Sequence, residues 1–155
     1  MKKSILINYE EYQSVEALSI ADRELMASAV AAADGAYSPY SHFCVGTAVR
    51  LVDGSIVIGS NQENVAYPSG LCAERTAMFA ASAQHPGVAF DALAIVGRPE
   101  GGELTAASPC GACRQVMAEY EKRWGRPLRV LLYWAGGHVV VFEGVDSLLP
   151  FGFAF

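Results

Sequence analysis

Three of the four cysteines lie in two short segments whose other residues suit metal chemistry. Cys72 stands two residues before Glu74, and further along the chain Cys110 follows directly after Pro109, with Cys113 three residues later. Cysteines spaced in this way form a disulfide, a closed structural metal site, or a catalytic metal site that keeps one ligand position open. The surrounding elements and residues must separate these three possibilities.

The cysteine segments are expected to begin two helices. One helix is predicted from about Cys72 to Gln84, where 85-HPG-87 ends it, and a second from Cys110 to about Trp124. Helix N-termini carry partial positive charge and unpaired N–H groups, which lower the pKa of a thiol and favour the thiolate form that binds metals. The predicted position at a helix N-terminus therefore favours metal binding by the cysteines of both segments.

The other segments predict an α/β fold. A helix is expected from Ser19, with Asp22 completing a capping box, to Asp34-Gly35. The predicted strands are 43–52, 55–60 (after a turn at Asp53-Gly54), 91–96, 128–134 and 138–143. The order α-β-β-α-β-α-β-β favours a three-layer α/β/α sandwich around a mixed five-stranded sheet. We expect one domain over residues 1–155, with residues 1–18 as a peripheral lead-in.

Composition narrows the class of protein. The 155 residues are 52% apolar and 17% charged, and acidic side chains outnumber basic ones 16 to 11, for a formal net charge of −5. Phosphate-binding surfaces need clustered Lys and Arg, so a polynucleotide partner is disfavoured. The apolar content suggests that some surface is buried against other subunits. We see neither a signal peptide nor a membrane span, and we expect a cytoplasmic protein with reduced cysteines.

Glu74 favours the catalytic interpretation of the cysteines. Cys110 and Cys113 can grip one ion from the same helical turn, and Cys72 can complete a set of three that leaves the fourth tetrahedral position open. A closed structural zinc site that also uses Cys44 is the main alternative, whereas a redox pair would leave Cys72 and Glu74 unexplained. Glu74, on a first helical turn, can accept a proton from zinc-bound water. Cys-x-Glu followed by Pro-Cys-x-x-Cys is the signature of zinc-dependent nucleobase deaminases.

Several further motifs occur in the same order as in one family. They are 39-PYSHFCVG-46, 61-NQENVAYPSG-70, 71-LCAERTA-77, 108-SPCGACRQVM-117 and 148-LLPFGF-153. Over residues 20–153 the chain resembles the small, homotetrameric cytidine deaminases with three cysteine ligands. The resemblance implies hydrolysis of cytidine and 2′-deoxycytidine to uridine, 2′-deoxyuridine and ammonia, in cytoplasmic pyrimidine salvage.

The resemblance also implies the reacting groups. Cys72, Cys110 and Cys113 hold one Zn²⁺ per subunit with water as the fourth ligand. Glu74 moves protons from that water to ring N3 and to the leaving amine. Arg75 hydrogen-bonds ligand sulfurs and draws negative charge off the metal.

Further residues are implied for substrate binding. Asn61 and Glu63 bind the sugar 3′-hydroxyl, Phe43 stacks on the pyrimidine, and Ala73 is a further substrate-binding residue. Two other segments belong to sites shared between subunits. They are Val65, Ala66 and Tyr67, which a second subunit lends, and Phe153, with Phe151 as the competing choice, which closes a neighbouring site.

Two alternatives remain open from the sequence. A blasticidin S deaminase shares the zinc core, and a non-catalytic zinc module would be closed by Cys44, which replaces the proline that usually follows Phe43 in the family. A polynucleotide deaminase is disfavoured, because those enzymes commonly have histidine in place of Cys72 and a basic groove.

Overall fold

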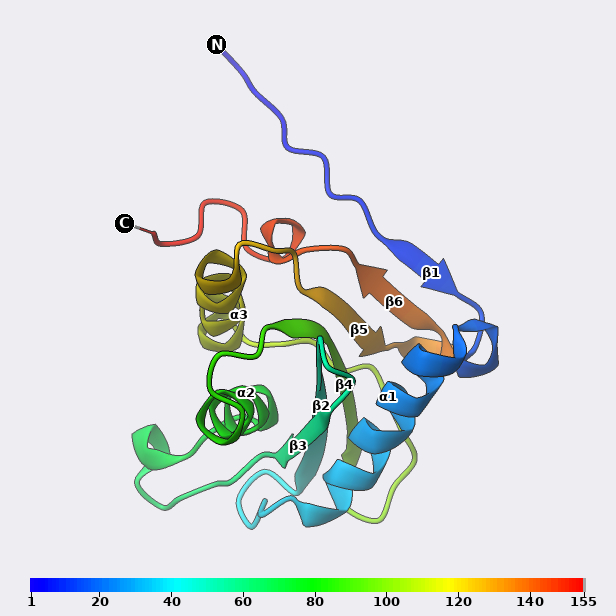
Figure 1. The fold of residues 1–155 in the computed structure, drawn as a ribbon. Helices are drawn as coiled ribbons and strands as arrows, with labels where there is room; N and C mark the ends of the chain where they lie inside the picture. Colours follow the sequence, from blue (N-terminus) through cyan, green and yellow to red (C-terminus); the bar gives the residue numbers. More distant parts are fainter. Residues whose placement is uncertain (155) are drawn as a thin grey trace.

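A computed structural model describes residues 1–154 of the chain, which form a mixed sheet between helices (Figure 1). The strands are β1 (Glu10–Tyr12), β2 (Phe43–Leu51), β3 (Ile56–Ser60), β4 (Phe90–Pro99), β5 (Arg129–Tyr133) and β6 (Val139–Phe142). The α-helices are α1 (Ile20–Ala32), α2 (Ala73–Gln84) and α3 (Gly111–Trp124). The predicted order of helices and strands from α1 to β6 is confirmed.

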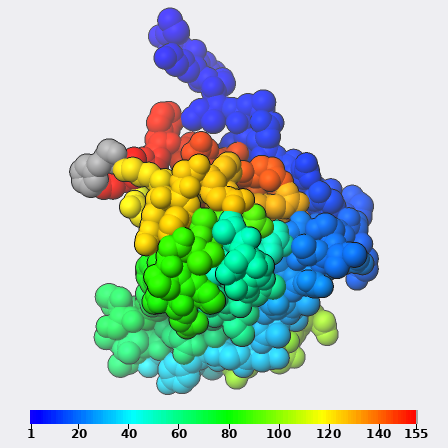
Figure 2. Space-filling view, in the orientation of Figure 1, coloured from blue at the N-terminus to red at the C-terminus, as the bar shows by residue number. Residues whose placement is uncertain are grey.

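The sheet contains six strands in the described part of the chain, so the prediction of five was wrong. Their order is β1-β6-β5-β4-β2-β3, in which β4 and β5 are parallel and every other neighbouring pair is antiparallel. The additional strand, β1, lies within the predicted lead-in and pairs with β6. Before β1, the first residues of the chain extend away from the sheet (Figure 2).

Helices cover both faces of the sheet, which confirms the three-layer arrangement (Figure 1). On one face, Leu25 and Ala29 of α1 belong to a buried cluster with Ala48 of β2. On the other face, residues of α2 and α3, among them Met78 and Met117, share a second cluster with residues of β2, β4 and β5. Burial of apolar side chains on both faces stabilises the central strands.

Two glycines allow helix backbones to lie directly on the sheet. A Cβ atom added to Gly46 of β2 would lie 2.0 Å from the carbonyl oxygen of Ala29, and one added to Gly59 of β3 would lie 2.4 Å from the nitrogen of Ala77. No side chain fits between backbone atoms at these distances. The contact at Gly59 therefore fixes how α2, which begins beside Cys72, sits on the sheet.

The start of α1 confirms half of the predicted capping box. The Ser19 hydroxyl accepts a hydrogen bond from the backbone N–H of Asp22 at 3.2 Å. The Asp22 carboxylate is buried and binds Arg50 Nη1 at 3.0 Å and Arg129 Nη2 at 3.2 Å. Its role is therefore to neutralise two arginines of the sheet, because a buried charge requires partners.

The Asp53-Gly54 turn is confirmed between β2 and β3. Gly54 has a φ of +88°, a conformation that favours glycine, and the Asp53 carboxylate accepts a hydrogen bond from Ser55 N at 2.9 Å. None of the helices formed by residues 1–154 combines the length and apolar character required to span a lipid bilayer.

Candidate active site

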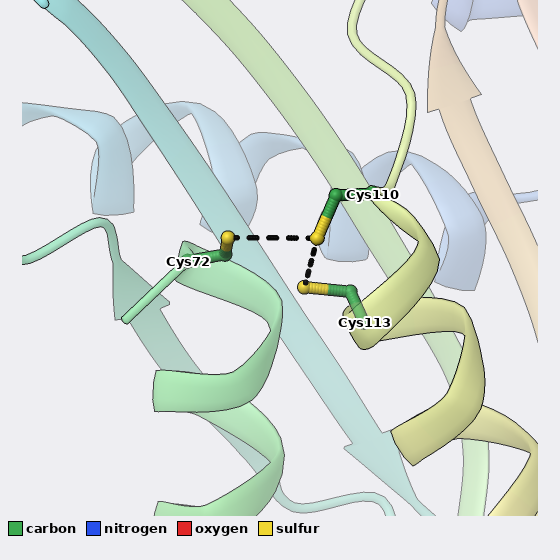
Figure 3. Close-up of side chains that lie close together, drawn as sticks. All are labelled: Cys72, Cys110 and Cys113. Atoms are coloured by element: carbon green, nitrogen blue, oxygen red, sulfur yellow. Dashed lines mark hydrogen bonds between the residues drawn. The ribbon is translucent and has the colours of Figure 1, made fainter. Parts of the chain in front are cut away.

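The N-termini of α2 and α3 meet on one side of the sheet and bring three sulfur atoms together. Cys72 and Cys110 are the residues immediately before α2 and α3, and Cys113 lies in the first turn of α3. The Sγ atoms of Cys72 and Cys110 are 3.7 Å apart, and those of Cys110 and Cys113 are 3.4 Å apart (Figure 3). The predicted convergence of the two cysteine segments is thus present in the fold.

The three cysteines fit a zinc ion. Their sulfur atoms all lie within 4.8 Å of one another and come from two helix N-termini, where thiolates are stabilised. A set of three thiolates suits zinc in particular, since soft sulfur ligands select this metal over magnesium or calcium. The fold therefore places Cys72, Cys110 and Cys113 where they can hold zinc.

Cys44 lies outside this cluster. The group of possible metal ligands in the described residues comprises Cys72, Cys110 and Cys113 alone. Cys44 is in β2, where its Sγ lies 3.5 Å from the hydroxyl of Ser38. This geometry argues against the zinc site closed by four cysteines.

Glu74 is a buried carboxyl group beside the sulfur cluster. It lies in the first turn of α2 and is 4% exposed. Burial raises the pKa of Glu74 to about 7, with the negative charge of Cys72 acting in the same direction. A carboxyl group with a pKa near neutrality can both accept and donate protons.

The sulfur atoms interact with one another and with Arg75, and these contacts change the pKa values of the thiols. The contact with Cys113 and that with Arg75, whose Nη2 lies 3.5 Å from Cys72 Sγ, together lower the pKa of the Cys72 thiol to about 5 against the opposing effect of burial. The contact with Cys72, together with burial, raises the pKa of Cys113. Arg75 therefore contacts a sulfur of the cluster, as the resemblance implied.

A cavity of about 800 Å³ opens beside the cluster. Six of the predicted substrate or sulfur-contacting positions line it together with Glu74: Phe43, Asn61, Glu63, Tyr67, Ala73 and Arg75. Cys72 and Cys110 line it as well, so the metal-binding sulfurs and the acid–base carboxyl face the same space. The volume suits a small molecule such as a nucleoside.

The side chains of Asn61 and Glu63 hold the loop that leads into β2. Asn61 Oδ1 accepts a hydrogen bond from Val45 N at 2.8 Å, and its Nδ2 donates to the carbonyl oxygen of Phe43 at 2.9 Å. The Glu63 carboxylate accepts hydrogen bonds from Tyr40 N at 2.9 Å and from Ser41 N at 3.2 Å. The two side chains therefore fix the start of β2, where Phe43 lies, and the residues just before it.

The remaining predicted site residues lie away from this cavity. Val65, Ala66, Phe151 and Phe153 are exposed, and they are not among the residues that line the cavity. The backbone of Phe153 is paired with the side chain of Gln115, which donates from Nε2 at 2.9 Å and accepts at Oε1 at 3.2 Å. Within one chain, these residues do not join the sulfur cluster.

Sequence reasoning missed Arg114, the residue after Cys113. Its guanidinium donates to the carbonyl oxygen of Pro109 at 2.8 Å, to the Ser108 hydroxyl at 3.0 Å and to the carbonyl oxygen of Leu148 at 2.8 Å. It thus ties the segment before Cys110 to the C-terminal segment. The position of Arg114 within the motif 108-SPCGACRQVM-117 could have indicated this role. An arginine on a helix, taken alone, suggests only an exposed positive charge.

Comparison with known proteins gives consistent matches. The family model described as the cytidine and deoxycytidylate deaminase zinc-binding region matches residues 19–124. A cytidine deaminase from Halalkalibacterium halodurans is 46% identical over 101 residues, which are 63% of this chain and 71% of the relative. One from Sporosarcina psychrophila is 50% identical over 98 residues, 63% of this chain and 68% of the relative.

The solved structures agree with the sequence matches. A crystal structure of cytidine deaminase from Burkholderia pseudomallei has a TM-score of 0.72 and 43% identity, covering 84% of this chain and 97% of that one. The corresponding enzyme from Mycobacterium tuberculosis has a TM-score of 0.67 and 36% identity, covering 85% and 96%. The match to the family model spans more than half of the chain and includes every residue of the sulfur cluster and Glu74. The chain therefore belongs to the cytidine and deoxycytidylate deaminase family.

Proposed function

We propose that the chain is a zinc-dependent hydrolase that converts cytidine and 2′-deoxycytidine to uridine and 2′-deoxyuridine with release of ammonia. The observation that carries this proposal is the position of Glu74, buried beside three convergent sulfur atoms and facing the same cavity as Phe43. Cytidine deaminases that are 45–50% identical to this chain support the assignment. A deaminase of this kind needs a metal site, a proton-transfer group and a surface on which the pyrimidine ring can stack. Residues suited to all three tasks line one cavity here.

Glu74 performs the proton transfers. When bound by Cys72, Cys110 and Cys113, zinc supplies a Lewis acid that brings the pKa of a coordinated water toward neutrality. The Glu74 carboxylate takes a proton from the attacking water and delivers it to ring N3, while the water oxygen bonds to C4. Glu74 then moves the second proton to the 4-amino group, the C4–N bond breaks, and ammonia leaves.

The walls of the cavity supply recognition of the nucleoside. Phe43 offers an aromatic surface to the pyrimidine, Ala73 lies at the buried start of α2, and Asn61 with Glu63 forms the polar wall on the sugar side. Polar groups left unpaired by a smaller substrate are costly, so the sugar contributes to selection.

The assay that tests this function follows the ultraviolet absorbance change and ammonia release of purified protein with cytidine, 2′-deoxycytidine, blasticidin S and free cytosine. Both nucleosides are expected to be deaminated, with kcat/KM for free cytosine lower by at least about a hundredfold. Preference for blasticidin S would favour the alternative deaminase. Absence of turnover with every substrate, in protein that contains zinc, would contradict the proposed function.

Arg75→Ala is expected to reduce turnover by about tenfold to a hundredfold while zinc stays bound. Three thiolates exceed the charge of one zinc ion, and the Arg75 contact with Cys72 offsets part of this excess. Kinetics and metal analysis of the purified variant measure both effects. Arg75→Lys is the matched control and should retain more activity, because it keeps the charge but loses the planar guanidinium. Wild-type turnover in Arg75→Ala would contradict the charge argument.

Exposed apolar residues support the proposal of a homotetramer with shared sites. Val65 and Tyr67 are 78% and 75% exposed, and Phe153 is 69% exposed. Exposed apolar groups of this size favour burial against another copy of the chain. In such an assembly the segment with Val65, Ala66 and Tyr67 and the C-terminal Phe153 complete neighbouring sites. A monomeric mass in light scattering at micromolar concentration would contradict this arrangement.

The expected cellular role is pyrimidine salvage in the cytoplasm. All four cysteines are unpaired, and three of them must stay reduced to bind a metal. A reducing compartment preserves this state.

A further inference from the structure

We propose that Gln115 is a positioning residue that acts on a neighbouring subunit: its side chain holds the backbone of Phe153 and thereby presents the Phe153 ring to the cavity of another copy of the chain. This inference rests on the proposed homotetramer with shared sites. It gives the start of α3 a second task besides carrying Cys113.

The Gln115 side chain binds one residue of the C-terminal segment at two points. Its Nε2 donates to the carbonyl oxygen of Phe153 at 2.9 Å, and its Oε1 accepts from the Phe153 N–H at 3.2 Å. The amide therefore pairs with the Phe153 backbone as a neighbouring strand would. Two hydrogen bonds from one planar group fix both the position and the direction of this part of the backbone.

The rest of the C-terminal segment explains why Phe153 needs this contact. Leu148 is buried in the core, and its carbonyl oxygen accepts a hydrogen bond from Arg114 Nη1 at 2.8 Å. Residues 150–154, by contrast, are all exposed. An exposed segment gains little from burial when it adopts one conformation, so specific hydrogen bonds must offset the loss of conformational entropy. Gln115 supplies two such bonds beyond the Leu148 anchor.

Gln115 points away from the cavity of its own chain. Residues two apart on a helix face nearly opposite sides, so Gln115 and Cys113 lie on different sides of α3. Neither Gln115 nor Phe153 is among the residues that line the cavity with Glu74. An effect of Gln115 on the reaction is therefore expected to pass through the Phe153 ring and into the cavity of another subunit.

The same contact distinguishes Phe153 from Phe151. Phe151 is 95% exposed and lies in a turn with a φ of +58°, whereas the Gln115 amide holds the backbone of Phe153. The Phe153 side chain remains largely exposed although its backbone is held. An exposed apolar ring in a defined position suits a complementary surface on another copy of the chain. Phe153 is therefore the aromatic residue that the C-terminal segment presents.

The first test assembles tetramers from two kinds of subunit. Gln115→Ala chains keep Glu74 but lose the hold on Phe153, whereas Glu74→Gln chains keep that hold but cannot transfer protons. Tetramers of Gln115→Ala alone are expected to deaminate cytidine with kcat/KM lower by about tenfold to a hundredfold, at unchanged zinc content. With a large excess of Glu74→Gln chains, kcat/KM per intact Glu74 should return to within about twofold of wild type.

Wild-type chains assembled with the same excess of Glu74→Gln chains give the reference for activity per intact site. Recovery would support action between subunits, because each Gln115→Ala cavity then receives Phe153 from a chain with an intact Gln115. If kcat/KM per intact site stays as low as in tetramers of Gln115→Ala alone, Gln115 acts within its own subunit and the proposal is overturned. A monomeric wild-type enzyme would overturn it as well.

The second test needs no substrate and separates this inference from the proposed reaction. Hydrogen exchange of the amides at residues 151–153 should become at least about tenfold faster in Gln115→Ala. Gln84→Ala, the same change at an exposed position of α2 away from the cavity, is the matched control and should leave exchange and turnover unchanged. Unchanged exchange in Gln115→Ala would overturn this proposal even if the wild-type enzyme deaminates cytidine, whereas the wild-type assay alone decides the proposed function.

A milder variant covers the case in which Gln115→Ala does not assemble. Gln115→Glu has nearly the same size and keeps an acceptor for the Phe153 N–H, but it places a second acceptor against the Phe153 carbonyl oxygen. A lower kcat/KM that recovers in assemblies with Glu74→Gln chains would support the proposal. Exchange and kcat/KM like those of wild type would contradict it.

Discussion

Glu74→Gln is expected to reduce kcat for cytidine by about 10²–10⁴-fold, the usual contribution of a positioned acid–base group. Glutamine has nearly the same size and fits the buried site at the start of α2, but its amide cannot carry a proton between water, N3 and the leaving amine. Glu74 is also absent from the group of possible metal ligands in the described residues. The protein should therefore fold and retain about one equivalent of zinc.

The control for this variant is Glu119→Gln, the same change at an exposed position of α3. It should retain wild-type kcat, because Glu119 does not line the cavity with the sulfur cluster. Two results would contradict the role of Glu74: a kcat within about threefold of wild type, or loss of zinc together with activity, which would make the carboxylate a ligand. Metal analysis beside each assay separates these outcomes.

Cys113→Ser is expected to weaken zinc binding by more than about a hundredfold, beyond the usual effect of residues that only support a ligand. Cys113 is fully buried, and its Sγ lies 3.4 Å from that of Cys110. A serine hydroxyl does not ionise near neutral pH and is a poor zinc ligand. After dialysis against a weak chelator, zinc content and turnover should fall together, and excess zinc should restore part of the turnover.

Cys44→Ser is the matched control, since it removes one thiol outside the cluster. It is expected to keep one zinc per chain and to retain activity, because its contact is with the Ser38 hydroxyl. Zinc loss from Cys44→Ser would instead support the alternative of a closed structural zinc site with four cysteine ligands. Full zinc content and turnover in Cys113→Ser would remove Cys113 from the ligand set.

The positions of the sulfur atoms could be predicted because local signals control them. Pro109 precedes one helix, 85-HPG-87 ends the other, and the predicted helix starts at Cys72 and Cys110 agree with the structure. Each signal acts within a few residues of the element that it starts or ends. The place of Glu74 on the first helical turn predicted proton transfer, whereas the role of Arg75 came from the resemblance, because its residue type alone could not assign it.

Features that join distant segments were not predicted. Strand β1 is three polar or aromatic residues without apolar alternation, and it forms because Val139–Phe142 offers a free edge. Asp22 binds Arg50 and Arg129, which come from different strands. Such contacts depend on where the chain folds back, and no local pattern encodes them.

The Asn61 side chain is an example within the site itself. The resemblance assigned its amide to the sugar 3′-hydroxyl, and that assignment stays a prediction, whereas its contacts with β2 were not predicted. The structure places the amide against Phe43 and Val45, which lie eighteen and sixteen residues earlier. This pairing becomes visible only when β2 and β3 lie side by side.

The close packing of α1 against Gly46 and of α2 against Gly59 limits how this scaffold can be redesigned. Randomised libraries that seek activity on new nucleobase analogues can vary residues that line the cavity. Codons 46 and 59 should stay constant, because any larger residue would push a helix off the sheet and, at Gly59, misplace the metal-binding end of α2. Screening effort is then confined to clones that still fold.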